Sequence, residues 1–245
     1  MKYKFGKHPP RHDKRTLLFK NYLAPELPPP PPQFDVLDRV FSNLQTQDVE
    51  ILFPMDGNDQ YGCCTFAAKA HAITAYQGLI GKRTIVSGPD VIAAYLAFTA
   101  GEDTGCNELD VLNDWRQKPF AGDQILGYAA INPRNHTNVM RAISMFGGVY
   151  LGFQVQEAAE TDFDARRTWT AGPLTADGHA VFATAYRPTG GTVLTWGNTQ
   201  AFDWHWWDMC VDECYAILPQ EAQDPNFCPG FDVQTLQADL ACVTR

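Results

Sequence analysis

Two adjacent cysteines at the start of an apolar stretch are the residues of this chain best suited to nucleophilic chemistry. Polar turn residues and a glycine at 58–62 precede Cys63 and Cys64, and an Ala-rich stretch follows them. Free backbone N–H groups and the helix dipole stabilise an anion at the start of a helix, so a thiol there ionises more readily. Cys64 is the predicted nucleophile, and Cys63 is the alternative.

A histidine far downstream is the predicted partner of this thiol. His179 follows an Asp-Gly turn and begins an apolar stretch that is typical of a β-strand. An imidazole beside the thiol can take its proton, form a thiolate and imidazolium pair, and later protonate a leaving amine. We therefore expect Cys64 and His179 to come from different parts of the fold and to meet.

These motifs, in this order, resemble the papain family of cysteine peptidases, in particular its compact bacterial and phage members. The residues at 62–65 stand where the family has Gly-Ser-Cys-Trp, the stretch 178–181 carries the histidine, and Trp196-Gly197 follows. The resemblance implies an α+β fold of two lobes, helical and then antiparallel β, with the site between them. It further implies thiol-dependent hydrolysis of a peptide or protein substrate by a cysteine-type peptidase, without a cofactor or metal.

The same resemblance suggests two supporting roles. The family's oxyanion-stabilising glutamine lies six residues before the nucleophile, where this chain has Asn58, and Gln60 is the rival donor. Such a donor lowers the barrier by about 3 kcal/mol. The family's orienting asparagine falls at Leu194, which cannot hold an imidazole. Asn198 is the favoured replacement, and Thr195 is the alternative.

The elements that must position these residues can be predicted from periodicity and turn signals. Helices are expected from residue 65 to about 78 or 81, at 88–98, 109–115 and 137–145. Strands are expected at 149–155, 179–186 and 192–196. Helices therefore precede strands, the pattern of an α+β protein.

The predicted organisation is an amino-terminal arm followed by one catalytic domain. Residues 1–49 form the arm, in which the run Pro28–Pro32 favours an extended polyproline path. Residues 50–245 form the domain, with a helical lobe at about 50–146, a β lobe at about 147–220 and a carboxy-terminal extension at 221–245. The position of the arm raises the hypothesis that it covers the cleft as an inhibitory segment.

Composition narrows the classes of partner and compartment. The chain has 245 residues, and 19 Lys and Arg against 28 Asp and Glu give a net charge of -9, which argues against a nucleic-acid partner. No apolar run has the length of a signal peptide core or a membrane span, so we expect a cytoplasmic protein without a membrane partner, and packaging in a particle stays open as an alternative. Seven cysteines are an odd number, and free thiols are expected in a reducing compartment.

Several features have a plainer interpretation. The acidic stretch at 102–110 is expected to be a solvated loop, and the aromatic cluster at 203–208 to pack in the core beside a strand. Cys210 and Cys214 are four residues apart but lack further ligands for zinc. Two other functions stay open: a catalytically silent papain-like binding or assembly module, and a thiol acyltransferase with an amine acceptor.

Overall fold

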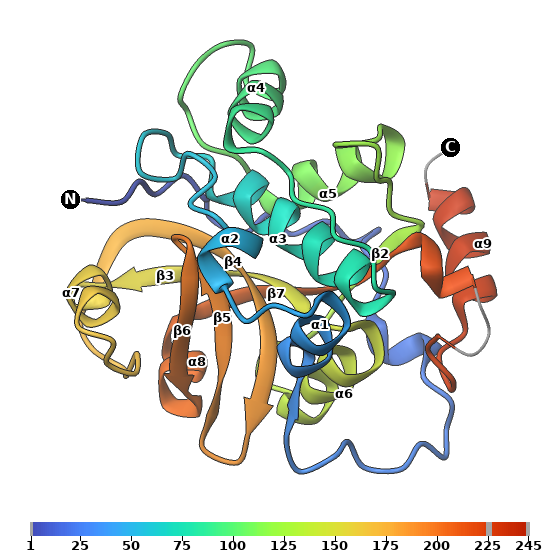
Figure 1. Cartoon of the computed structure of the whole chain (residues 1–245). Coiled ribbons are helices and arrows are strands. Elements are labelled where there is room, and N and C mark those ends of the chain that lie inside the picture. The colour runs from blue at the N-terminus through green and yellow to red at the C-terminus, as the bar shows by residue number, and fades with distance from the viewer. Residues whose placement is uncertain (1, 224–226, 244–245) are drawn as a thin grey trace.

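The computed structural model describes residues 2–223 and 227–243, and it places helices over an antiparallel sheet (Figure 1). The helices are α1 Val36–Leu44, α2 Val49–Leu52, α3 Cys64–Leu79, α4 Gly88–Phe98, α5 Glu108–Gln117, α6 His136–Phe146, α7 Ala159–Asp164, α8 Trp204–Cys210 and α9 Val233–Val243. The strands are β1 Phe34–Asp35, β2 Gly127–Ala130, β3 Val149–Gln156, β4 Leu174–Arg187, β5 Gly190–Thr195, β6 Asn198–Asp203 and β7 Val211–Leu218. Short 3-10 helices lie at Phe19–Tyr22 and Gln220–Gln223.

The sheet has the strand order β2-β7-β3-β4-β5-β6, and β1 pairs with the far end of β4. All of these pairings are antiparallel. Helix α3 packs against β4, while α4 and α5 lie beside α3 on the side away from the sheet (Figure 1). The result is a helical side and a strand side, with α3 at the boundary.

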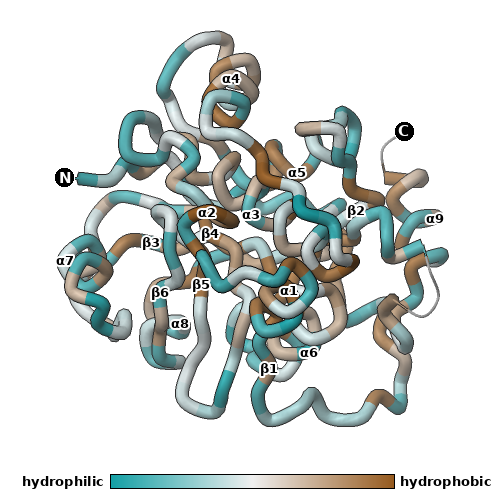
Figure 2. The backbone as a smooth tube through the Cα atoms, in the orientation of Figure 1, coloured by the Kyte–Doolittle hydropathy of each residue, from teal (hydrophilic) through white to brown (hydrophobic). Residues whose placement is uncertain are grey.

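Helix α3 is buried almost all round, not only along the stripe that its sequence suggests. All but two of its sixteen residues are buried. A helix that is apolar on every face belongs in a core, and the many alanines of α3 let neighbouring elements approach it closely. Hydrophobic stretches run along the inner elements, whereas hydrophilic residues mark many of the outer loops (Figure 2). Among the described residues, no helix is long and apolar enough to cross a membrane.

A tight turn joins β5 to β6 and shapes the strand side of the site. Thr195 pairs with Asn198 across the hairpin, and Trp196 and Gly197 form its two-residue loop with φ angles of 49° and 76°. Positive φ at both loop residues is the geometry of a type I′ turn, which matches the twist of the strands that it joins. A bulky residue pays strain of about 1–3 kcal/mol in this conformation, so the position of Trp196 is held by its packing.

The structure confirms the predicted helices and strands near the site and corrects several boundaries. His179 lies within β4, which begins five residues earlier at Leu174, because the expected turn at 177–178 continues the strand. The aromatic cluster at 203–208 packs in the core beside strands, as expected, with Trp206 and Trp207 fully buried. It contains the start of α8, since Asp203 caps the helix by accepting a hydrogen bond from the Trp206 N–H.

The predicted lobes do not follow these elements closely. Helix α1 lies within the predicted arm, yet it packs against α3 and β4 as part of the body. Strand β2 lies within the predicted helical lobe, yet it pairs with β7. Of the predicted extension, the residues at 224–226 and 244–245 lie outside the described part, and α9 packs against β2 and the 3-10 helix at 19–22.

Candidate active site

Cys64 is the first residue of α3, as its sequence context predicts, and its side chain is fully buried. Burial raises the pKa of the Cys64 thiol, because a thiolate loses its hydration there. The backbone N–H groups of Ala180 and Gly6 lie at the sulfur and oppose part of this rise. Ala180 directly follows His179 on β4, so the thiol faces the stretch of the sheet that carries the predicted base.

Cys63 points elsewhere, although it is the neighbour of Cys64 in the chain. Its sulfur donates a hydrogen bond to the Asp56 carbonyl oxygen at 3.4 Å. A Cβ atom built on Gly57 would lie 3.9 Å from that sulfur, so Cys63 packs into the loop before α3. The two candidate nucleophiles therefore have different surroundings, and Cys64 is the one whose sulfur meets β4.

His179 is buried and is held by one polar contact and three aromatic rings. Its Nε2 atom lies 2.8 Å from the Thr195 hydroxyl oxygen, and its Nδ1 atom has no hydrogen-bond partner among the described residues. The rings of Phe5, Phe153 and Trp196 have centroids 5.6, 5.6 and 4.9 Å from that of the imidazole. One ring nitrogen is thus anchored, and the other is available to a proton donor.

Thr195, not Asn198, is the residue that contacts the imidazole. The Asn198 side chain instead accepts a hydrogen bond from the Thr199 N–H at 2.9 Å. The reason is the type I′ turn, which places Thr195 on β5 next to β4 and Asn198 at the start of the outer strand β6. A hydroxyl can donate or accept, so Thr195 can hold either form of the imidazole.

Asn58 and Gln60, the two candidate oxyanion donors, differ in exposure. Asn58 is buried, and its side-chain amide donates to the carbonyl oxygens of Lys4 at 2.9 Å and Tyr61 at 3.2 Å. Gln60 is exposed. The structure therefore places Asn58 on the inside of the loop before Cys64 and Gln60 on its outside.

A short stretch of the amino terminus, residues 3–8, lies across this site; we call it the cleft segment. On the helical side its backbone exchanges hydrogen bonds with Cys106, which donates to Gly6 at 2.7 Å and accepts from His8 at 2.9 Å. On the strand side the Lys7 N–H donates to the Gly178 carbonyl at 3.1 Å. The segment thus joins the two sides directly over Cys64. In Figure 1 it lies close to the end marked N.

Glycines allow this close crossing. A Cβ atom on Gly6 would lie 1.8 Å from the Gly62 carbonyl oxygen, and one on Gly178 would lie 2.4 Å from the Lys7 carbonyl oxygen. Neither distance is possible for a real side chain. The sequence motif at 62 and the Asp-Gly before the histidine therefore have a packing role that motif reasoning missed.

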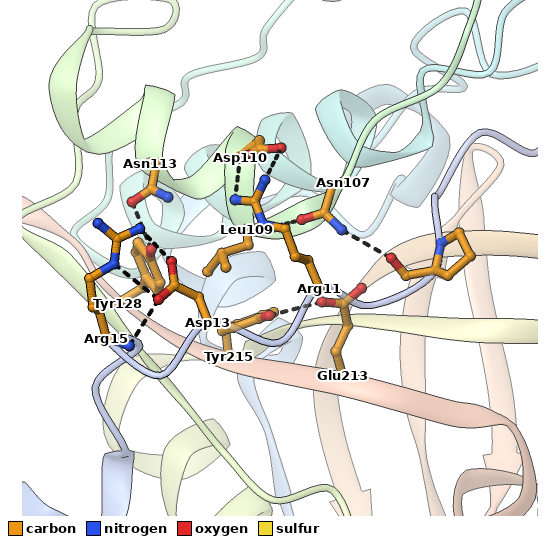
Figure 3. A network of polar contacts seen from close by, with 11 residues as sticks. Arg11, Asp13, Arg15, Asn107, Leu109, Asp110, Asn113, Tyr128, Glu213 and Tyr215 are labelled. Carbon is orange, nitrogen blue, oxygen red and sulfur yellow. Dashed lines mark hydrogen bonds and ion pairs between the residues drawn. The ribbon is translucent and has the colours of Figure 1, made fainter.

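Side chains on both sides of the site fix the cleft segment further. The Tyr3 ring stacks on that of Trp196 with centroids 4.2 Å apart, and its hydroxyl donates to Asp164 at 2.8 Å. After the segment, Arg11 forms a two-pronged ion pair with Asp110 of α5 (Figure 3). No signal in the sequence identifies this docking, because it depends on contacts between residues more than 50 positions apart.

Burial decides the charge state of the site. A thiolate and imidazolium pair needs a thiol that gives up its proton more readily than the imidazolium does. Here burial raises the pKa of Cys64, while burial and then the nearby His71 lower the pKa of His179 to about 3. Both shifts favour the neutral thiol and the neutral imidazole, so the covered site is held in an uncharged form.

Among the described residues, no group of three or more His, Cys, Asp or Glu side chains is arranged to hold a metal ion. All seven cysteines are free, and Cys210 and Cys214 lie on different elements, the end of α8 and strand β7.

The comparisons with known proteins rest on structure alone, since neither a protein-family model nor a curated protein sequence matches the chain. Xylellain, a cysteine protease from Xylella fastidiosa, is 14% identical, with a TM-score of 0.63 over 89% of this chain and 96% of that one. Procathepsin B from Trypanosoma congolense is 11% identical, with a TM-score of 0.57 over 89% and 87%. The cysteine protease and lectin-like domains of Cwp84 from Clostridium difficile are 15% identical, with a TM-score of 0.56 over 88% of this chain and 55% of that one. The chain therefore has the fold of the papain-like cysteine proteases, as its motifs predicted.

Proposed function

We propose that this chain is a cysteine peptidase in which Cys64 is the nucleophile and His179 is the base. The observation that carries the proposal is the meeting of the first residue of α3 with the segment of β4 that holds His179. The thiol lies at the Ala180 N–H, and the imidazole of the preceding residue, His179, is anchored through Nε2, with Nδ1 left unpaired among the described residues.

The reaction follows from these positions. The thiol proton passes to Nδ1 of His179, and the sulfur attacks the carbonyl carbon of a peptide bond. The negative charge that forms on the carbonyl oxygen is stabilised by the Asn58 side-chain amide and the Cys64 N–H. His179 then protonates the leaving amine, and water cleaves the thioester to release the acid and restore the thiol. Thr195 orients the imidazole throughout.

The cleft segment keeps this site latent. Gly6 presents its N–H to the thiol, and its carbonyl oxygen accepts a hydrogen bond from the Cys106 N–H, so the segment's backbone fills the place that a substrate needs. The Asn58 amide, needed for the oxyanion, is occupied by the Lys4 carbonyl. The segment therefore acts as an inhibitor that is part of the chain, and catalysis requires that it leave.

A thiol-directed epoxide probe tests the proposal in the whole chain and in a Gly6→Ala variant. Alanine at this position collides with the Gly62 carbonyl, so the variant displaces the cleft segment. We expect labelling at Cys64, faster in Gly6→Ala than in the natural chain and strongly reduced by His179→Ala. Peptide hydrolysis by Gly6→Ala should accompany it. A labelling rate that is unchanged by His179→Ala, together with no peptide hydrolysis, would instead fit a catalytically silent module of the same fold. Amide products formed with added amines would indicate an acyltransferase.

A further inference from the structure

Lys7 of the cleft segment is buried in a pocket lined with acidic side chains, immediately beside the proposed nucleophile. Only 5% of the residue is exposed. Its Nζ atom lies 2.9 Å from the Asp212 carboxylate and 3.1 Å from Glu213 Oε1, and it donates to the His8 carbonyl at 3.2 Å. The residues that form this acidic pocket come from both sides of the site: Glu108, Gly152, Asp212 and Glu213.

We propose that the acidic pocket is a specificity site, which selects substrates with a lysine side chain within two residues of the bond that is cleaved. This inference rests on the proposed peptidase function, and it adds the substrate class. In the latent chain, Lys7 occupies the place that a substrate lysine takes in the open enzyme.

The pocket holds more carboxyl groups than Lys7 alone contacts. Glu108 is fully buried, and neither of its carboxyl oxygens has a hydrogen-bond partner among the described residues. Glu213 has one oxygen bonded by the Tyr215 hydroxyl at 2.8 Å, a contact visible in Figure 3, and its other oxygen faces Lys7. Buried carboxyl groups without partners are costly, and an ammonium group is the ligand that relieves this cost.

The Lys7 ammonium group and the carboxyl groups of the acidic pocket shift each other's pKa values. Burial raises the pKa of Glu108, and the neighbouring Glu213 raises it further. Burial alone would lower the pKa of Lys7, but Glu108, Glu213 and Asp212 raise it above its ordinary value. A cation in the pocket is thus stabilised by the carboxyl groups, whereas an apolar side chain would leave them without compensation.

The shape of the pocket suits a long unbranched side chain. A Cβ atom on Gly152 would lie 1.9 Å from Lys7 Cε and 2.7 Å from Glu108 Oε1. The missing side chain on β3 is therefore what leaves room for the lysine methylenes. Any other residue at 152 would fill the passage to Glu108.

The backbone around Lys7 shows why a substrate would place a side chain in the same pocket. The Gly178 carbonyl and both backbone groups of Cys106 bind the cleft segment, and they can bind an extended peptide in the same way. The Gly6 N–H lies at the Cys64 sulfur, and Lys7 is the next residue. A peptide held by these partners therefore has a side chain at the pocket close to the reacting bond.

Peptide binding to a chain that cannot react tests the pocket separately from catalysis. The host is the full chain with Gly6→Ala and Lys7→Glu, which displace its own segment, and Cys64→Ala. The probes are fluorescent peptides with the sequence of residues 2–12, in the natural form or with norleucine in place of Lys7. A third peptide has norleucine in place of Lys4, whose residue is exposed in the structure, and it serves as the matched control.

We expect the natural peptide to bind about 100-fold more tightly than the peptide that lacks the Lys7 ammonium group, because the latter leaves buried carboxyl groups unpaired. The Lys4 control should match the natural peptide within about twofold, as expected for an exposed charge. Glu108→Gln in the host should reduce the Lys7 preference at least about tenfold. Equal affinities for the Lys7 and norleucine peptides would overturn the proposal.

Two further measurements keep the test decisive. In the full chain, Lys7→Met should speed probe labelling of Cys64 and Lys4→Met should not; equal rates would contradict a pocket that anchors lysine. A peptide library cleaved by the Gly6→Ala chain should show lysine enriched at one position within two residues of the cut. Cleavage without that enrichment overturns the pocket and leaves the peptidase intact. Selective lysine binding with no cleavage of any peptide supports the pocket and contradicts the peptidase.

Discussion

The helical side and the strand side of the candidate site hold the two proposed catalytic residues in different ways. On the helical side, Cys64 is fixed by the backbone, since it begins α3 and meets two N–H groups. On the strand side, His179 is fixed by side chains, the Thr195 hydroxyl and the rings around it. No other side chain can replace Cys64 at the start of the helix, whereas several side chains share the positioning of His179. Substitution of Cys64 should therefore abolish peptide hydrolysis, whereas substitutions around His179 should each lower its rate in part.

The largest expected difference in peptide hydrolysis is between substitutions of the two adjacent cysteines. In the Gly6→Ala chain, we expect Cys64→Ser to reduce peptide hydrolysis by at least about 10³-fold, as for other nucleophiles that act as part of a unit. Cys63→Ser should change it by less than about threefold, since its hydroxyl can keep the hydrogen bond to Asp56. Initial rates with a fluorogenic peptide measure both. Comparable losses in the two variants would remove the distinction between the neighbouring thiols.

The next largest effect is expected on the labelling rate of Cys64 when the cleft segment is displaced. Gly6→Ala forces a Cβ atom against the Gly62 carbonyl, so the segment should leave and Cys64 should become accessible. We expect epoxide labelling to become roughly 30-fold faster or more, which is the effect of losing about 2 kcal/mol from the closed state. Gly172→Ala is the matched control, since a Cβ atom there meets nothing within 4 Å. An unchanged labelling rate in Gly6→Ala would show that the segment does not limit access.

The sequence predicted the helical side more completely than the strand side, for a physical reason. A helix start can be recognised locally from turn residues followed by an apolar run, so Cys64 could be placed from neighbouring residues alone, whereas Asn58 came from the family resemblance. The orienting residue depends on how two strands are joined, and the I′ turn shifts the contact from Asn198 to Thr195.

Features that depend on distant contacts were not predictable. Glu108 belongs to a stretch that its charge marks as a solvated loop, yet it is fully buried at the start of α5. Its burial depends on Lys7, about 100 residues away, and on strands of the sheet. The arm hypothesis expected an inhibitory segment somewhere before residue 50, but the docking of residues 3–8 follows from close backbone approaches at glycines that no local pattern reveals.

On the strand side, loss of the Thr195 hydroxyl should lower the rate of hydrolysis only in part. Thr195→Val keeps the shape of the side chain and removes the hydroxyl that holds His179, so we expect hydrolysis by the Gly6→Ala chain to fall about tenfold. Thr184→Val is the control: Thr184 is also buried, on β4, and its hydroxyl has no hydrogen-bond partner among the described residues. Equal kcat values in the two valine variants would argue that Thr195 does not orient the base.

The smallest expected effect is that of the residue that the motif comparison favoured. Asn198→Ala removes a side chain that bonds only its neighbour Thr199 in the described contacts, and we expect kcat/KM to change less than about twofold. A loss as large as that of Thr195→Val would return Asn198 to the orienting role and imply a rearranged hairpin in the open enzyme.

The central claim is that Cys64 and His179 form a reactive ion pair once the cleft segment leaves. Its most direct test is the rate of Cys64 alkylation by iodoacetamide as a function of pH in the Gly6→Ala chain, with and without His179→Ala. With His179 present, the thiol pKa should fall below that of a free cysteine, so alkylation should persist as the pH falls to about 6. Without His179, the rate should drop about tenfold per pH unit below roughly 8.5, as for an unassisted thiol. Two coincident profiles with a midpoint near or above that of a free thiol would contradict the pairing.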